Sequence, residues 1–151
     1  MAELQQLVAS ANEWLDLEAV PDYPQALNGL QLEGKTEVHK VAAAVDACLP
    51  VIEQACEIEA DLLVVHHGLF WQGAQKIEGA LYQKLKLAMD HGLAIYSAHI
   101  PLDVHPELGN NVGLLRAMGI ESGEESFFPW KEIQLGLAVD VSCSFEDLLS
   151  K

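Results

Sequence analysis

The sequence predicts a three-layer-like α/β fold, in which a parallel or mixed sheet is flanked by helices. From residue 40 onward, short apolar runs alternate with amphipathic segments in the order strand, helix, strand, helix, strand, helix. That order favours parallel strands joined by right-handed crossover helices. The length of 151 residues fits one domain with a substantial core.

Each element follows from its own pattern of apolar residues. The first helix is expected at 3–16, because Leu4, Leu7 and Val8 begin a helical repeat. The remaining helices are expected at 50–59, 79–91 and 109–118, and the strands at 40–46, 61–66 and 93–98. Between the first helix and the first strand, two prolines indicate a loop, and Asn28-Gly29 suits a tight turn within it.

The C-terminal residues predict a strand at 135–141, followed by a helix that Ser144 caps. The chain ends at Lys151, barely two helical turns later, and isolated helices below about 12–15 residues are marginal. We therefore expect residues 1–151 to form a single α/β domain that belongs to a longer protein.

Composition excludes several classes of function. Half of the residues are hydrophobic, so the chain is not disordered, and no apolar stretch approaches the ~20 residues needed to span a bilayer. The N-terminus shows no signal-peptide pattern, which predicts a cytoplasmic protein. The net charge of −15 repels nucleic acid and anionic membranes and favours divalent cations. The cysteines, Cys48, Cys56 and Cys143, are expected to be reduced, buried thiols.

Metal-binding side chains follow the predicted strands. His66 and His67 end the second strand before Gly68, and the third strand leads into a loop with His99 and Asp103. The carboxyl ends of parallel strands meet at one edge of a sheet, where ligands bind. His66, His67 and Asp103 are therefore expected to be metal ligands.

Two arrangements of the adjacent histidines stay open. Neighbouring residues of a regular strand point to opposite faces, so the two rings share a site only if the strand has ended and the backbone turns at Gly68. Otherwise each binds one of two neighbouring ions, about 3.5–4 Å apart. His99 and Asp46 are assigned to catalysis, where they orient substrate or move protons. For Asp46, a hydrogen-bonded carboxylate at the strand end is favoured over a metal ligand.

Several other side chains have two interpretations. His105 is expected on a surface loop, with capping or substrate contact as the alternatives, and Asn110 and Asn111 are expected to cap a helix. Core or interface positions are favoured over base stacking for Phe70 and Trp71. Packing beneath the last strand is favoured over an exposed interface for Phe127, Phe128 and Trp130.

Linked motifs match a known family in order and spacing. They are Asn28-Gly29-Leu30-Gln31, Ala44-Val45-Asp46, the run from Asp61 to Trp71, Ala98-His99-Ile100-Pro101-Leu102-Asp103 and Gly109-Asn110-Asn111. The chain thus resembles the Nif-three-like family of dinuclear-metal-centre proteins, often called GTP cyclohydrolase I type 2 homologues. The match runs to about Gly119, and more loosely to the end.

The resemblance implies two similar halves per protein, a homo-oligomeric ring of six copies and a two-metal site that faces an inner cavity. In that family the residues matching His66, His67 and Asp103 are ligands of two divalent ions. Zinc, iron, manganese, cobalt or nickel would suit such ligands. The family's remaining ligands, a histidine and a glutamate, lie in a C-terminal half, and this sequence has no histidine after His105.

Two functions are consistent with these residues. The first is a metal-dependent hydrolase in which the dinuclear site activates water toward a nucleotide-like small molecule. GTP is implied by resemblance only, because the sequence has no P-loop or other nucleotide motif. The alternative is a non-enzymatic metal-binding or interaction protein.

Overall fold

The computed structural model describes residues 2–70, 73, 75–120 and 125–149, so Trp71 lies outside the described residues. The chain forms two compact units, Met1–His99 and Ile100–Lys151. The first contains β1 (Ala2–Glu3), α1 (Leu4–Trp14), β2 (Gly29–Leu32), β3 (Glu37–Val38), β4 (Val41–Asp46), α2 (Leu49–Glu57), β5 (Leu62–His67), α3 (Gly79–His91) and β6 (Ala94–Ser97). The second contains α4 (Ile100–Asp103), α5 (Asn110–Ala117), β7 (Glu125–Trp130), β8 (Ile133–Ala138) and α6 (Phe145–Leu149).

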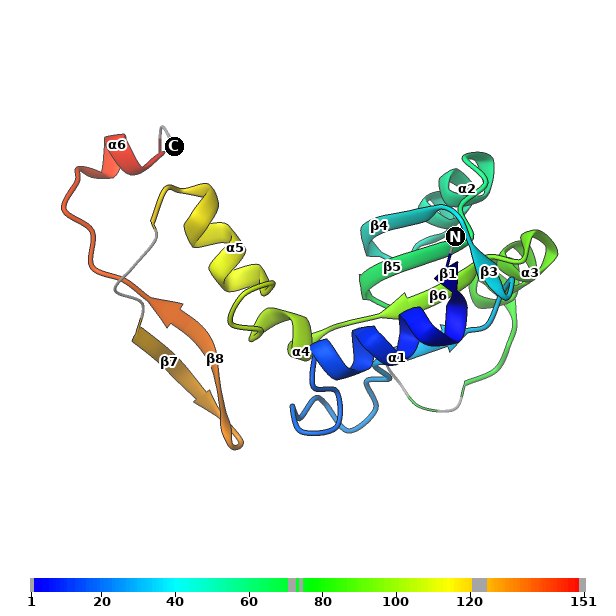
Figure 1. Cartoon of the computed structure of the whole chain (residues 1–151), viewed down its shortest axis with the longest axis horizontal. Coiled ribbons are helices and arrows are strands. Elements are labelled where there is room, and N and C mark those ends of the chain that lie inside the picture. The colour runs from blue at the N-terminus through cyan, green and yellow to red at the C-terminus, as the bar shows by residue number, and fades with distance from the viewer. Residues whose placement is uncertain (1, 71–72, 74, 121–124, 150–151) are drawn as a thin grey trace. The chain divides into compact units, whose positions relative to one another are not determined.

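A four-stranded mixed sheet in the order β2-β6-β5-β4 forms the centre of the first unit (Figure 1). The strands β4, β5 and β6 run parallel, with Ala43 opposite Val64 and Val64 opposite Tyr96. The strand β2 pairs antiparallel with β6. This confirms the predicted α/β fold and places the ends of β4, β5 and β6 at one edge.

The segment around Asn28-Gly29 corrects the prediction of a tight turn. Residues Gly29–Leu32 form β2, and Leu30 lies opposite Tyr96. The local sequence favours a turn, but the strand arises from backbone pairing with β6, more than sixty residues away.

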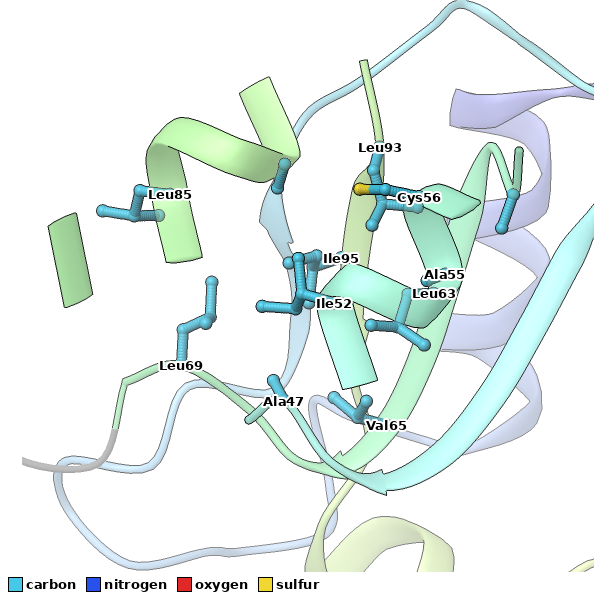
Figure 2. Packing of buried hydrophobic residues seen from close by; sticks show 12 residues of the cluster. Ala47, Ile52, Ala55, Cys56, Leu63, Val65, Leu69, Leu85, Leu93 and Ile95 are labelled. Atoms are coloured by element: carbon cyan, nitrogen blue, oxygen red, sulfur yellow. The ribbon is translucent and has the colours of Figure 1, made fainter. Parts of the chain in front are cut away.

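Helices cover both faces of this sheet. On one face, α2 and α3 pack over buried side chains that include Ile52, Leu63 and Ile95, as Figure 2 shows. On the other face, the Tyr96 hydroxyl donates a hydrogen bond to Asn12 Oδ1 of α1, at 3.0 Å. Residues of β5 are therefore buried from both sides, which explains why its sequence is almost continuously apolar.

Local signals explain where several helices begin and end. Gly92 terminates α3 with a φ of 64°, a left-handed conformation that glycine adopts without strain. The predicted Ser144 cap is confirmed, because its Oγ accepts a hydrogen bond from the Asp147 N–H at 3.1 Å. Gly109, not Asn110 or Asn111, is the N-cap of α5, so that part of the prediction is wrong.

Two further expectations need correction. The loop expected around His99 contains the short helix α4. Cys56 alone is buried among the three cysteines, whereas Cys48 is partly buried and Cys143 is exposed. Phe70 packs against the core, in agreement with one of its two expected positions.

Among the described residues, no helix is long and apolar enough to cross a membrane.

The second unit contains a β-hairpin that the sequence only half predicted. The strand expected at 135–141 is β8, and it pairs antiparallel with β7. Phe127 lies opposite Gly136, and its ring occupies the space that a side chain at position 136 would fill. Phe127 and Phe128 are nevertheless exposed for more than half of their surface, so the expectation that they pack beneath the last strand is wrong, whereas Trp130 is partly buried.

Candidate metal centre

Three histidines meet at the carboxyl edge of the sheet. His66 and His67 are the last two residues of β5, and His99 follows β6 by two residues. One potential ligand nitrogen from each ring lies within 4.8 Å of the other two. The ring centroids of His66 and His67 are 4.6 Å apart, and that of His99 lies 4.9 Å from His66. The parallel order of β5 and β6 produces this cluster, because it brings both strand ends to the same edge.

Each of the three rings is held through its Nδ1 atom. His66 Nδ1 lies 2.9 Å from the Ala98 carbonyl oxygen, and His67 Nδ1 lies 2.6 Å from Asp46 Oδ1. His99 Nδ1 lies 3.0 and 3.1 Å from the two carboxylate oxygens of Asp22. Carbonyl and carboxylate oxygens only accept hydrogen bonds, so each Nδ1 carries a hydrogen and the neutral ring has its lone pair on Nε2. The three rings are therefore in the tautomer in which Nε2 can bind a metal.

Asp22 is a functional candidate that the sequence analysis missed. Its side chain is 6% exposed, and Asn28 Nδ2 donates a hydrogen bond to Oδ2 at 2.8 Å. Burial alone would raise the pKa of Asp22, but hydrogen bonds from Asn28, from the Tyr23 N–H and from His99 outweigh it and lower the pKa. Asn28 also accepts a hydrogen bond from the His99 N–H at 2.8 Å. Together these bonds fix both the ring and the backbone of His99.

The cluster is closed on one side and open on the other. The His99 side chain is 14% exposed, whereas those of His67 and Asp46 are 45% and 59% exposed. The His99–Asp22 pair is thus shielded from water, and the His67–Asp46 pair borders solvent.

The adjacent histidines belong to one cluster although β5 formally includes both. They are its final residues, Gly68 follows, and Asp46 lies opposite His67 in the register of β4 and β5. The alternative of two ions, one for each histidine, remains a prediction.

The predicted catalytic and ligand residues divide into three groups. His99 lies with the two predicted ligands in a group that could hold an ion, and Asp46 contacts His67 and positions its ring. Asp103 lies in α4 of the second unit, where its Oδ1 accepts a hydrogen bond from Asn110 Nδ2 at 2.8 Å. Its role as a ligand, like the catalytic roles of His99 and Asp46, stays a prediction.

The donor set fits a divalent transition metal. Histidines that bind metals usually donate their other N–H to a carboxylate or a backbone carbonyl, and all three rings here do so. Three imidazoles with a water molecule would supply four ligands, the number found in catalytic zinc sites. Within the described part of the chain, this is the one such group of three or more potential ligands.

Fold and site together define an α/β protein with a candidate metal centre at the carboxyl edge of its parallel strands. The family model for Duf34/NIF3 (NGG1p interacting factor 3) matches residues 2–151. The chain belongs to this family, and the fold and resemblance expected from the sequence are confirmed.

Named relatives and solved structures agree with this assignment. The chain is 44% identical over 134 residues to a GTP cyclohydrolase 1 type 2 homolog of Pyrococcus abyssi, covering 89% of this chain and 52% of the relative. It is 41% identical to a Thermus thermophilus protein of known crystal structure, with a TM-score of 0.75 over 86% of this chain and 52% of the other. Reduced HcgD from Methanocaldococcus jannaschii is 25% identical, with a TM-score of 0.81 over 99% of this chain and 58% of the other. The chain thus spans about half the length of the curated relatives it matches.

Proposed function

We propose that this chain carries part of a dinuclear metal centre of a hydrolase, which activates water toward a nucleotide-like small molecule. The observation that carries the proposal is the set of three histidines whose Nδ1 atoms are all held by acceptors. The relatives' name, GTP cyclohydrolase 1 type 2 homolog, favours a nucleotide-like substrate.

In this proposal the histidines bind the metal ion and two aspartates position the histidine rings. His66, His67 and His99 would hold an ion through Nε2, while Asp46 and Asp22 keep the rings of His67 and His99 in place. A divalent ion held there would supply polarisation of substrate oxygens and a lower pKa for bound water. By resemblance, we propose Asp103 as a further ligand and a second ion as its partner. A ring of six copies is likewise proposed from resemblance.

A non-enzymatic metal-binding or interaction protein is the second candidate. The exposed aromatic side chains of Phe127 and Phe128 favour it, because they are suited to contact another protein surface. The two candidates share metal binding and differ in turnover.

Metal content tests the shared part. We expect protein purified without chelator to contain divalent metal by elemental analysis, and the variant His66→Ala/His67→Ala to lose it. His39→Ala is the matched control, because His39 is an exposed histidine outside the cluster and should leave metal content unchanged. A folded, metal-free wild type, or equal metal in the double variant, would contradict the proposal.

Turnover separates the two candidates. Metal-loaded wild type and the double variant are incubated with nucleoside triphosphates, and products are resolved by chromatography. Hydrolysis that is lost in the double variant supports the enzyme, and its absence from metal-loaded wild type supports the interaction protein. Sedimentation of the same samples measures whether the chain forms the proposed ring.

A further inference from the structure

A donor-rich cavity lies within the second unit and is lined by residues of that unit alone. Its volume is about 420 Å³, which suits a small organic molecule. Its polar lining consists of Asp103, His105, Asn111, Arg116, Ser126 and Gln134. These side chains come from the α4–α5 segment and from the β7–β8 hairpin, so long-range packing forms the cavity.

Arg116 supplies the positive charge of this cavity. It is the single arginine of a sequence with 8 basic and 23 acidic residues. One guanidinium nitrogen, Nη1, donates a hydrogen bond to the Glu107 carbonyl oxygen at 2.6 Å. That bond uses one of five N–H donors and anchors the group, and a guanidinium matches the geometry of carboxylate and phosphate oxygens.

His105 adds a second donor with a defined tautomer. Its Nδ1 accepts hydrogen bonds from the N–H groups of Glu107 and Leu108, at 3.1 and 3.0 Å. A nitrogen that accepts from backbone N–H carries no hydrogen, so the neutral ring bears its hydrogen on Nε2. His105 thus lies in the loop between α4 and α5, as expected, where its ring accepts hydrogen bonds from a turn and also lines the cavity.

The backbone around His105 is held in place because Gly109 lies directly against the His105 carbonyl oxygen. The Gly109 N–H donates to the His105 carbonyl at 3.0 Å, and a Cβ at position 109 would lie 2.3 Å from that oxygen. Only glycine fits there without moving the loop. Across the cavity, Asn111 Nδ2 donates to the Leu135 carbonyl at 2.7 Å, which ties α5 to the hairpin. The donors are thus organised before any ligand arrives.

We propose that this cavity binds the oxyanion group, phosphate or carboxylate, of a small organic molecule, with Arg116 as its main contact and His105 Nε2–H as a second donor. The one carboxylate in the lining, Asp103, is the residue proposed above as a metal ligand, and it accepts a hydrogen bond from Asn110. Anions are repelled by the overall charge of −15, so binding depends on the local guanidinium. The proposal goes beyond the proposed function, because it requires no metal.

Titration followed by ¹⁵N–¹H spectra tests the site. Inorganic phosphate and succinate are added separately to the metal-free chain at constant ionic strength. We expect saturable shifts confined to the signals of residues that line the cavity, and affinity about tenfold weaker in Arg116→Gln. Saturation by phosphate, by succinate or by both supports the site and identifies the oxyanion it prefers.

Two further variants keep the test independent of folding. Arg116→Lys retains the charge but loses the planar fork, so its affinity should lie between those of wild type and Arg116→Gln. Lys131→Gln removes a cation outside the cavity lining and should bind as wild type does. Shifts spread over the surface lysines, no saturation, or equal affinity in Arg116→Gln would overturn the proposal. Loss of metal binding in the histidine variants would leave this result unaffected.

Discussion

The two ends of β5 use aspartates in opposite ways. Before the amino end, the side chain of Asp61 is 8% exposed and binds Lys35 Nζ at 2.8 Å. It also accepts hydrogen bonds from the N–H groups of His39 and Lys40, at 2.8 and 3.0 Å. At the carboxyl end, Asp46 and Asp22 bind imidazole rings instead.

The partner decides what each carboxylate does. An ammonium group or a backbone N–H has no lone pair that could bind a metal, so its carboxylate partner serves only to hold the fold together. An imidazole that donates from Nδ1 keeps a lone pair on Nε2, so its carboxylate partner prepares it to bind a metal. We therefore assign the amino end of β5 to stability and the carboxyl end to ligand binding, and four predictions test this difference.

Replacing Asp61 with alanine should produce the largest loss of stability. The substitution leaves the N–H groups of His39 and Lys40 without their acceptor and removes the partner of Lys35, so the free energy of unfolding should fall by about 2 kcal/mol. Denaturant unfolding measures this effect. Asp90→Ala is the control, because it removes a Lys–Asp pair that is exposed and should cost only about 0.5 kcal/mol. Equal losses in the two variants would contradict the structural role of Asp61.

Stability should also fall in acid through Asp61. The hydrogen bond from Lys35 is the largest cause that lowers the Asp61 pKa from 3.8 to about 2. Because the pKa is lower in the folded state, the carboxylate stabilises the fold above pH 3.8, and this contribution is lost as pH falls toward 2. Unfolding measured across this range should show a slope in wild type that is reduced in Asp61→Asn. An unchanged slope in the variant would assign acid sensitivity to other carboxylates.

Asp22→Asn should weaken metal binding more than it weakens the fold. Two carboxylate oxygens of Asp22 now face His99 Nδ1, and asparagine replaces one of them with an NH₂ donor and removes the negative charge, so the ring of His99 is held less firmly. Loss of such a partner typically reduces metal affinity by about 10–100-fold. Calorimetric titration with Zn²⁺ measures this change, and Asp61→Asn, at the other end of β5, should bind Zn²⁺ as wild type does. Unchanged affinity in Asp22→Asn would exclude the proposed positioning role.

Asp46→Asn should have the smallest effect on the same titration. The carboxylate also holds a histidine, but both partners border solvent, where water competes for the hydrogen bond. We expect the loss of Zn²⁺ affinity to stay below about tenfold. A loss larger than that of Asp22→Asn would show that the open side of the cluster, not the closed side, controls metal binding.

Periodicity in the sequence was sufficient to predict most elements of the first unit. The helix predicted at 79–91 matches α3, and the predicted strands match β4, β5 and β6 within two residues. These segments have strong apolar repeats, and burial rewards the conformation that places such a repeat on one face. β2 was missed because its strand conformation depends on pairing with β6, which a local pattern does not record.

The sequence by itself determined that histidines, which can bind a metal ion, stand at the carboxyl edge of the sheet. Two histidines end one strand and a third follows the next, and the alternation of strands and helices brings those ends together. The tertiary structure alone decided how the rings are held. Asp22 and Asn28 reach His99 across more than seventy residues, where Asp22 selects the tautomer of the ring and Asn28 holds the backbone N–H. Spacing along a chain predicts contacts within an element, whereas a partner from a distant loop is chosen by the packing of the whole unit.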